Sequence, residues 1–139
     1  MSGTNDLENA ALKWIFNSTA PAWSTSTGFY VSLHTAEPGE AGTQLTSETT
    51  YTAYARVFVD RFTSTGWTVA SNVAFNTTAI SFPTPTGGTT GSGLTHFGVG
   101  TVSTAAGTLL FFGPLATTHT LSTSTNPTFD SSALTITSS

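Results

Sequence analysis

One half of this chain contains no side chain with a full charge at neutral pH. From Phe62 to Phe129 the sequence has no Asp, Glu, Lys or Arg, and it consists mainly of Thr, Ser, Gly and apolar residues. Thr is favoured in strands and Ser and Gly in turns, so this stretch is typical of a β-protein. General acid–base catalysis needs titratable groups, and nucleic-acid binding needs positive charge. We therefore expect a structural β-protein that is not an enzyme and binds no nucleic acid.

The composition argues against a disordered chain. Disordered chains combine few aromatic residues with a high net charge. Here 12% of the 139 residues are aromatic, and the formal net charge is −4. The absence of cysteine excludes disulfides and thiolate metal ligands. No stretch approaches the roughly 20 apolar residues of a membrane span, and no secretory signal pattern is present, so we expect no membrane association.

The spacing of apolar residues predicts one short helix near the N-terminus. These residues follow the i, i+3, i+4, i+7, i+8 pattern of one helix face: Leu7, Ala10, Ala11, Trp14 and Ile15. Asn5 is expected to cap the helix, with Glu8 three residues later, and the helix is expected to end near Asn17. A helix this short must pack on something. Both an ordinary core helix and an anchoring arm that presents Trp14 and Phe16 remain open.

The rest of the chain is predicted to form short strands separated by turns. Apolar and polar residues alternate from Phe29 to His34, which indicates a strand. Further strands are expected at 55–62, 66–70, 73–75, 79–82, 94–102, 108–112, 117–122 and 134–137. The strands at 66–70 and 73–75 should form a hairpin, the Gly113-Pro114 pair should end the strand before it, and 83–93 should be a polar loop.

This succession predicts an all-β fold. About seven or eight strands with turns between them indicate an antiparallel β-sandwich or a jelly-roll-like barrel, with one short N-terminal helix. The sequence has no internal repeat and no shift in composition that would mark a boundary. We expect a single domain over 1–139, with the helix and an arm in 1–20 and the sandwich in 28–139.

No group of residues has the spacing of a catalytic or metal site. The three histidines are His34, His96 and His119, and their spacing does not supply the three or four ligands of a zinc site. They are expected to pair with backbone carbonyls or water, although His34 and Glu37 can meet at a strand end. A Gly-x-Ser-x-Gly elbow in a strand–turn–helix context is also missing. We predict no catalytic residues, no metal and no cofactor.

Arg56, Asp60 and Arg61 are candidate interface residues, together with Trp14 and Phe16 of the helix. In a strand, positions 56 and 60 face one side and 61 faces the other. Arg56 is expected to pair with Asp60 or with an acid on a neighbouring strand or subunit. An exposed pair contributes only about 0–1 kcal/mol, whereas a buried arginine matters more because its loss leaves an unpaired charge. A solvated edge is the equally open alternative.

The segment YVSLHTAEPGEAG, at positions 30–42, is the most distinctive pattern in the chain. It is followed in order by YARV at 54–57, AISFP at 79–83, THFGV at 95–99, GTLLFFGPL at 107–115 and ALTIT at 133–137. With these segments the chain resembles small virion proteins of tailed bacteriophages, of the head-decoration or tail-fibre-like type with an LHTAxPGExG motif. The resemblance implies a structural protein at the surface of the phage particle, made in the host bacterial cytoplasm.

Three functions agree with this resemblance and with the composition. We expect a capsid decoration or cement protein that contacts the major capsid protein or other virion proteins, as a homo-oligomer for which a trimer is possible. A tail-fibre, tail-tip or baseplate module is the first alternative. The second is a receptor- or carbohydrate-binding module with aromatic stacking platforms at Trp23, Trp67, Tyr51 and Tyr54. Exposed aromatic residues near loops would favour that module, and a self-complementary apolar patch would favour decoration.

Overall fold

The computed structural model describes residues 2–62, 65–89 and 93–138, and it is built almost entirely from antiparallel strands. A single α-helix and one 3₁₀ turn precede most of the strands. In chain order the elements are β1 (Ser2–Gly3), α1 (Asn5–Asn17), η1 (Ala22–Thr25), β2 (Gly28–His34), β3 (Val57–Asp60), β4 (Trp67–Ala70), β5 (Val73–Asn76), β6 (Ile80–Ser81), β7 (Gly93–Gly100), β8 (Leu109–Thr120), β9 (Thr128–Phe129) and β10 (Thr135–Thr137).

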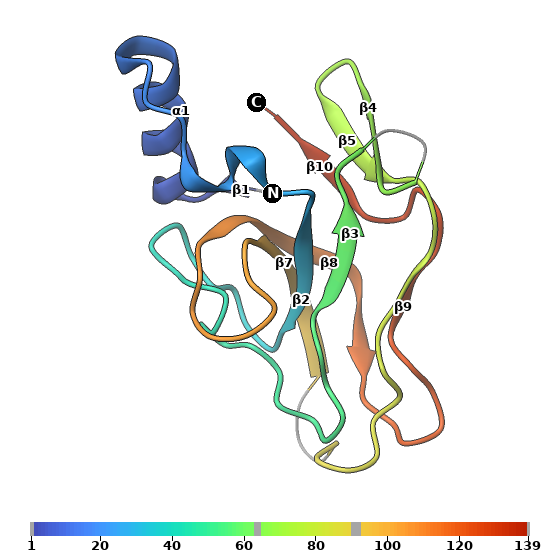
Figure 1. The fold of residues 1–139 in the computed structure, drawn as a ribbon. Coiled ribbons are helices and arrows are strands. Elements are labelled where there is room, and N and C mark those ends of the chain that lie inside the picture. Colours follow the sequence, from blue (N-terminus) through green and yellow to red (C-terminus); the bar gives the residue numbers. More distant parts are fainter. Residues whose placement is uncertain (1, 63–64, 90–92, 139) are drawn as a thin grey trace.

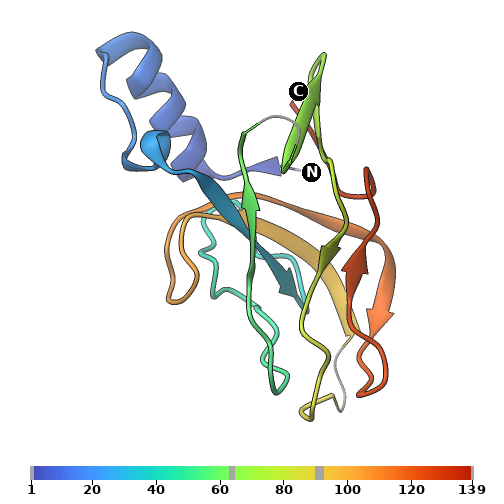
Figure 2. The same cartoon turned by 45° about the vertical axis from the view of Figure 1, so that its right-hand side comes forward.

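The strands form one large sheet and two smaller ones. The five-stranded sheet has the order β1-β8-β7-β2-β3, the three-stranded sheet the order β10-β5-β4, and β6 pairs with β9. Every one of these pairs is antiparallel. The smaller sheets lie across one face of the large sheet (Figures 1 and 2), and the described strands do not close into a barrel. The predicted all-β sandwich with a short N-terminal helix is confirmed.

The core lies between the large sheet and the smaller ones. In the centre of the large sheet Val31 is opposite Val99 and Leu33 is opposite Phe97, and all four side chains are buried. Buried residues from the other side of the sandwich complete the cluster, among them Ile80, Phe82, Leu121, Leu134 and Ile136. Burying each large apolar side chain contributes about 1.5–3 kcal/mol, so this cluster is the main source of stability.

The opposite face of strand β2 is buried as well. Ser32 and His34 alternate with the core residues, yet both are 0% exposed. The segment that follows β2 folds back over them, and it brings the side chain of Gln44 into full burial. The alternation of apolar and polar residues thus predicted the strand correctly but did not indicate that its polar side would also be covered.

Strand β8 differs from its prediction. It runs unbroken from Leu109 to Thr120, although Gly113 and Pro114 were expected to break it. Strand β1 pairs only with the part of β8 before Gly113, and the register between β7 and β8 shifts between Pro114 and His119. Proline is tolerated at edges and bulges because its missing N–H then removes no ladder bond. The predicted hairpin is confirmed as β4–β5, with Ser71 in the left-handed region at φ 56°.

The start of α1 is attached to the large sheet. Thr4, and not Asn5 as predicted, caps the helix, because its side chain accepts a hydrogen bond from the Leu7 N–H at 3.3 Å. Thr4 is buried and its own N–H donates to the Leu110 carbonyl at 3.0 Å, which holds the cap against β8. The helix ends at Asn17, as predicted, with Ser18 in the left-handed conformation at φ 52°.

Asn76 provides a test of how the sandwich is held together. Its buried Nδ2 donates to the carbonyls of Thr78 and Asp130 at 2.8 and 2.9 Å, and its Oδ1 accepts from the Leu134 N–H at 2.9 Å. Asn76→Ala leaves these backbone groups unpaired, so the free energy of unfolding should fall by about 2–4 kcal/mol in urea denaturation. The exposed Asn72, which donates to the Ser138 carbonyl, is the control: Asn72→Ala should cost no more than about 1 kcal/mol. Equal losses in the two variants would contradict this role of Asn76.

Candidate interface: an exposed helix beside an apolar cleft

The helix α1 leaves most of its apolar surface uncovered in the single chain. None of its residues is buried, and Leu12, Ile15 and Phe16 are 57%, 72% and 77% exposed. The expectation of an ordinary core helix is therefore wrong. Isolated helices of about this length are only marginally stable, and exposed apolar patches commonly mark contact sites with other molecules. The surface of α1 is thus the first component of a candidate interface.

The two sides of α1 have different surroundings. Its inner side carries the half-buried residues Leu7, Ala10 and Ala11, and Trp14 packs edge-on against Trp23 with 6.2 Å between ring centroids. The other side carries four exposed residues with the spacing i, i+4, i+7 and i+8, which place them on one stripe. This outer stripe consists of Glu8, Leu12, Ile15 and Phe16. Ile15, predicted on the same face as Leu7, lies one turn after Ala11 at the border of the two sides and is 72% exposed.

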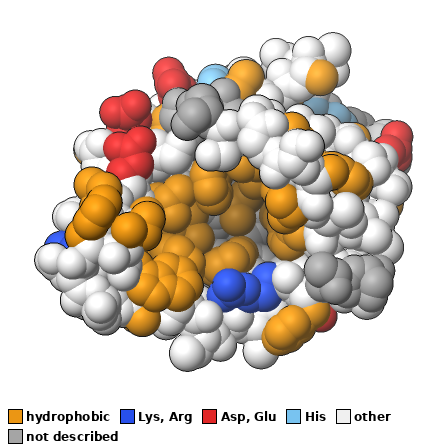
Figure 3. Space-filling view, turned by 90° about the horizontal axis from the view of Figure 1, so that it is seen from above, with side chains coloured by type: hydrophobic (Ala, Val, Ile, Leu, Met, Phe, Trp, Pro, Cys, Tyr) orange, Lys and Arg blue, Asp and Glu red, His pale blue; other side chains and the backbone are white. Residues whose placement is uncertain are grey.

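An apolar cleft opens at the same end of the molecule as α1. It has a volume of about 370 Å³, and strands of both larger sheets contribute to its walls. Its main apolar lining residues are Phe29, Trp67, Val69, Val99, Phe111 and Ile136. Figures 1 and 2 show α1 and the β4–β5 hairpin rising at this end, and Figure 3 shows a hollow walled by hydrophobic side chains with basic side-chain atoms at its opening. This apolar cleft is the second component.

Aromatic side chains connect the helix to the cleft. Trp23, which contacts Trp14 of the helix, also packs edge-on against Phe29 with 6.1 Å between ring centroids. Phe29 in turn lines the apolar cleft. Helix and cleft therefore form neighbouring parts of one apolar surface.

Arg61 supplies a positive charge to the wall of the cleft. Its Nη1 donates to the backbone carbonyls of Trp23, Ser24 and Ser26 at 3.1–3.2 Å, which ties the turn η1 to the end of β3. Its guanidinium carbon lies 5.4 Å from the centre of the Phe29 ring, a cation–π contact. Asp60 faces elsewhere, and its carboxylate accepts the Phe62 N–H at 2.7 Å.

The side chain of Trp67 lines the cleft, but its polar atom is enclosed by the fold. Its indole Nε1 is buried and has no hydrogen-bond partner among the residues that the structure describes. A buried indole N–H usually finds an acceptor. Because this nitrogen is itself buried, it is not open to an occupant of the cleft in this structure.

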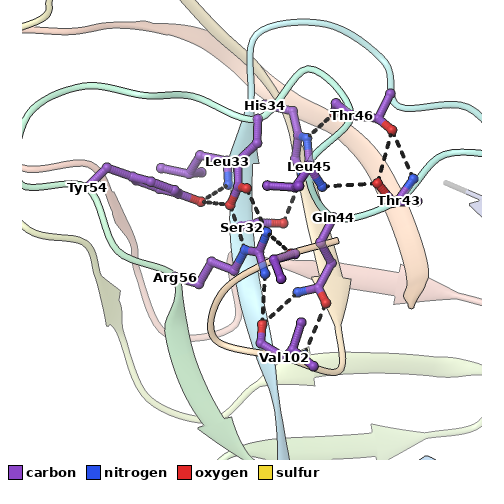
Figure 4. A network of polar contacts seen from close by, with 12 residues as sticks. Ser32, Leu33, His34, Thr43, Gln44, Leu45, Thr46, Tyr54, Arg56 and Val102 are labelled. Atoms are coloured by element: carbon purple, nitrogen blue, oxygen red, sulfur yellow. Dashed lines mark hydrogen bonds and ion pairs between the residues drawn. The ribbon is translucent and has the colours of Figure 1, made fainter. Parts of the chain in front are cut away.

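Arg56 belongs to a buried network on a different part of the surface (Figure 4). Its Nε and Nη2 each donate to one oxygen of the Glu48 carboxylate at 2.7 Å, and both side chains are more than nine-tenths buried. Arg56 also donates to the carbonyls of Val102 and Ala105 at 3.0 and 2.9 Å. Arg56 therefore pairs with an acid on a neighbouring segment, close to the second option that the sequence left open, whereas Asp60 as its partner and the solvated edge are wrong. The interface role of Arg56, Asp60 and Arg61 stays a prediction.

The network around Arg56 joins three segments of the chain. The Tyr54 hydroxyl donates to Glu48 at 2.7 Å and accepts the Leu33 N–H of β2 at 3.1 Å. Gln44 donates to the Val102 carbonyl at 3.0 Å and accepts from the Val102 N–H at 3.1 Å. The loop between β7 and β8 is therefore fixed to the segment that covers β2. This arrangement explains the burial of Arg56 without any partner chain.

The histidines do not gather into a reactive site. The ring of His34 is fully buried and lies 2.8 Å from both the Thr46 carbonyl and the Ser32 hydroxyl. Desolvation by burial lowers its pKa from 6.5. The backbone of His34 forms an isolated antiparallel bridge with Glu48. The sequence had allowed a contact of His34 with Glu37 instead. Within residues 2–62, 65–89 and 93–138, no three His, Cys, Asp or Glu residues come together as a metal site.

Two of the four aromatic residues predicted as stacking platforms are buried, and Trp23 and Tyr54 are partly buried. Tyr51 and Trp67 are 3% and 9% exposed, so the expectation that they present open faces to a sugar is wrong. The Tyr51 hydroxyl donates to the Pro83 carbonyl at 2.7 Å, and burial raises the pKa of Tyr51 to about 12. Burial also raises the pKa of Tyr54, whose hydroxyl is held by Glu48. The predicted contact loop at 83–93 includes residues 90–92, which lie outside the described residues.

Sequence reasoning included Trp14 and Phe16 in the interface but missed Leu12, Val69 and the cleft itself. A signal for Leu12 exists, because Leu12 and Phe16 extend the apolar surface of the second half of α1 beyond the predicted face. The cleft has no such signal, since six strands contribute to it.

No described helix has the length and apolar character needed to cross a membrane.

Comparison with known proteins gives one result for nearly the whole chain. A protein-family model described as "Podophage GP4 fiber I protein gp80" matches residues 2–137. A search of curated proteins finds no match. The family match confirms the predicted kinship with structural proteins of the phage particle. It does not test the LHTAxPGExG segment as a family motif.

The buried ion pair gives a prediction for stability. Arg56→Met leaves the Glu48 carboxylate buried without its partner, so the free energy of unfolding should fall by about 3–5 kcal/mol in urea denaturation. Arg56→Met combined with Glu48→Met should recover part of this loss, because no buried charge remains unpaired. Lys13→Met on the exposed side of α1 is the control and should stay within about 0.5 kcal/mol of the wild type. A loss from Arg56→Met as small as that of the control would contradict the network.

His34 gives a prediction for the pH dependence of stability. Because its pKa is lowered in the folded chain, the unfolded chain binds a proton at pH values where the folded chain does not. The contribution of His34 to the free energy of unfolding is therefore complete above its ordinary pKa of 6.5 and is lost as the pH falls below it. Urea midpoints measured at about pH 7.5 and about pH 5.5 should differ less in His34→Gln than in the wild type. An unchanged difference would show that His34 does not carry this pH dependence.

Proposed function

The chain belongs to the family of the podophage GP4 fiber I protein gp80, and we propose that it is a non-enzymatic subunit of a fibre on the phage particle. The observation that carries this proposal is the family match over residues 2–137. The matched range includes the helix and all the strands of the described fold.

The structure supports an assembly role through the surface it leaves uncovered. Proteins of the phage particle act by binding other proteins, and specific interfaces have apolar centres depleted in charge. The outer stripe of α1 and the apolar cleft have this character, because each has one charged residue, Glu8 or Arg61, and is otherwise mainly apolar. The buried residues of the polar network already have partners within the chain, which leaves them with a structural role.

Capsid decoration, expected from the sequence, is the second candidate. The observation in its favour is the same apolar surface of α1, which a capsid lattice would also cover. The two candidates differ in position and copy number on the particle. A carbohydrate-binding module is less well supported, because Tyr51 and Trp67 are buried.

The position of the protein on the particle tests the proposal. Gold-labelled antibodies against the chain should mark fibres in electron micrographs of intact phage, and particles lacking its gene should lack both the label and those fibres. Label spread evenly over the head would overturn the fibre role in favour of capsid decoration. No label on purified particles would overturn both.

A further inference from the structure

We propose that the outer stripe of α1 from one copy of the chain occupies the apolar cleft of a second copy. Each copy would donate one helix and receive one. The inference deepens the proposed fibre role and rests on it, because it names the partner that covers the exposed helix. Its support comes from the volume of the cleft, from the charges on the two surfaces, and from the way α1 is attached to its own sheet.

The cleft has room for the side chains that α1 offers. A cavity of about 150 Å³ is enough to hold a benzene molecule. The volume of about 370 Å³ therefore accepts the ring of Phe16 and a neighbouring aliphatic side chain such as Ile15. Both residues are more than 70% exposed in the single chain, and their burial would remove the largest uncovered apolar side chains of the helix.

The charges on the two surfaces are complementary. Glu8 begins the outer stripe, one helical turn before Leu12, and is exposed. Arg61 lies in the wall of the cleft, and the hydrogen bonds of its side chain to described residues all leave from Nη1. Its remaining N–H groups suit a carboxylate, and a guanidinium and a carboxylate form strong charge-assisted hydrogen bonds. A helix without a carboxylate at this position would leave the remaining N–H groups of Arg61 without a charged acceptor.

The basic residues of the chain make this pairing selective. The sequence has three of them: Lys13, Arg56 and Arg61. Arg56 is committed to Glu48. Lys13 lies on α1 itself and is exposed. Arg61 is therefore the basic residue that can attract an acidic helix into the cleft.

The helix cannot present its outer stripe to its own cleft while its attachments hold. The cap residue Thr4 is bonded to Leu110 of β8, and Trp14 packs on Trp23. These contacts direct the inner side of α1 toward its own chain, so the outer stripe on the opposite side faces away. A second copy can reach it without breaking either contact.

The area is sufficient for a stable assembly. The exposures of Leu12, Ile15 and Phe16 leave roughly 400 Å² of apolar side-chain surface uncovered. Covering it also covers the smaller exposed lining of the cleft, so two contacts bury roughly 1,000 Å², which is near the lower limit for a specific interface. Because the helix and the cleft are different surfaces, the contact closes as a reciprocal dimer or as a ring such as a trimer.

Cross-linking between two singly substituted chains tests the contact directly. The chain has no cysteine, so introduced thiols react without background. Purified Phe16→Cys and Val69→Cys chains, mixed and mildly oxidised, should form a disulfide-linked heterodimer, because Val69 lines the cleft and is 69% exposed. The control replaces Phe16→Cys with Leu45→Cys, an exposed position that belongs to neither the helix nor the cleft lining, and should give no such product. Equal yields from the two mixtures would overturn the proposal.

Charged substitutions test whether the contact holds the assembly together. In analytical ultracentrifugation of the wild-type chain we expect a closed oligomer, and Phe16→Glu or Val69→Glu should each raise its dissociation constant roughly 30-fold or more. A mixture of the two variants should form heterodimers, since one copy keeps an intact helix and the other an intact cleft. Leu45→Glu should assemble as the wild type does. Circular dichroism checks that each variant is folded.

The outcomes separate this inference from the fibre role. A monomeric wild type, or an oligomer unchanged by both Phe16→Glu and Val69→Glu, would overturn the helix-in-cleft contact even if the protein is found on fibres. A cross-linked oligomer of a protein that is absent from the phage particle would overturn the fibre role and leave the contact standing.

Discussion

The buried ion pair between Arg56 and Glu48 is the interaction on which the covering of the large sheet depends. Two hydrogen bonds of 2.7 Å join the side chains, and further bonds reach β2 through Tyr54 and the β7–β8 loop through Val102. Although the chain has few charges, one complete ion pair lies where the segment after β2 and the β7–β8 loop meet the sheet. Without it, the polar face of β2 would lose its cover.

This internal covering determines which surface is left for other molecules. One face of the large sheet is covered by the smaller sheets, and around β2 the other face is covered by the loops of the Arg56 network (Figures 1 and 4). The apolar surface that stays open lies at the end where α1 projects beside the cleft (Figure 3). For a family of phage fibre proteins, an uncovered helix and a cleft of matching chemistry are reasonable means of joining subunits.

Much of the fold followed from local sequence patterns, and the candidate interface followed only in part. Alternation at residues 29–34 predicted β2, and the turn between 66–70 and 73–75 predicted the β4–β5 hairpin, because both depend on neighbouring residues. Other features depend on residues far apart in the chain. Thr4 caps α1 because it is held by Leu110, and Arg56 is enclosed because it also donates to Val102 and Ala105, 46 and 49 residues further along the chain. Trp14 and Phe16 were recognised from the sequence, but the cleft is formed by strands from the whole chain.

The most direct measurement is a cryo-electron microscopy reconstruction of the fibre on intact phage particles, at a resolution that shows large side chains. The account predicts that α1 of one subunit lies across the apolar cleft of its neighbour, with Phe16 inside the cleft and Glu8 beside Arg61. A fibre in which α1 is surrounded by solvent, or in which another protein fills the cleft, would contradict it.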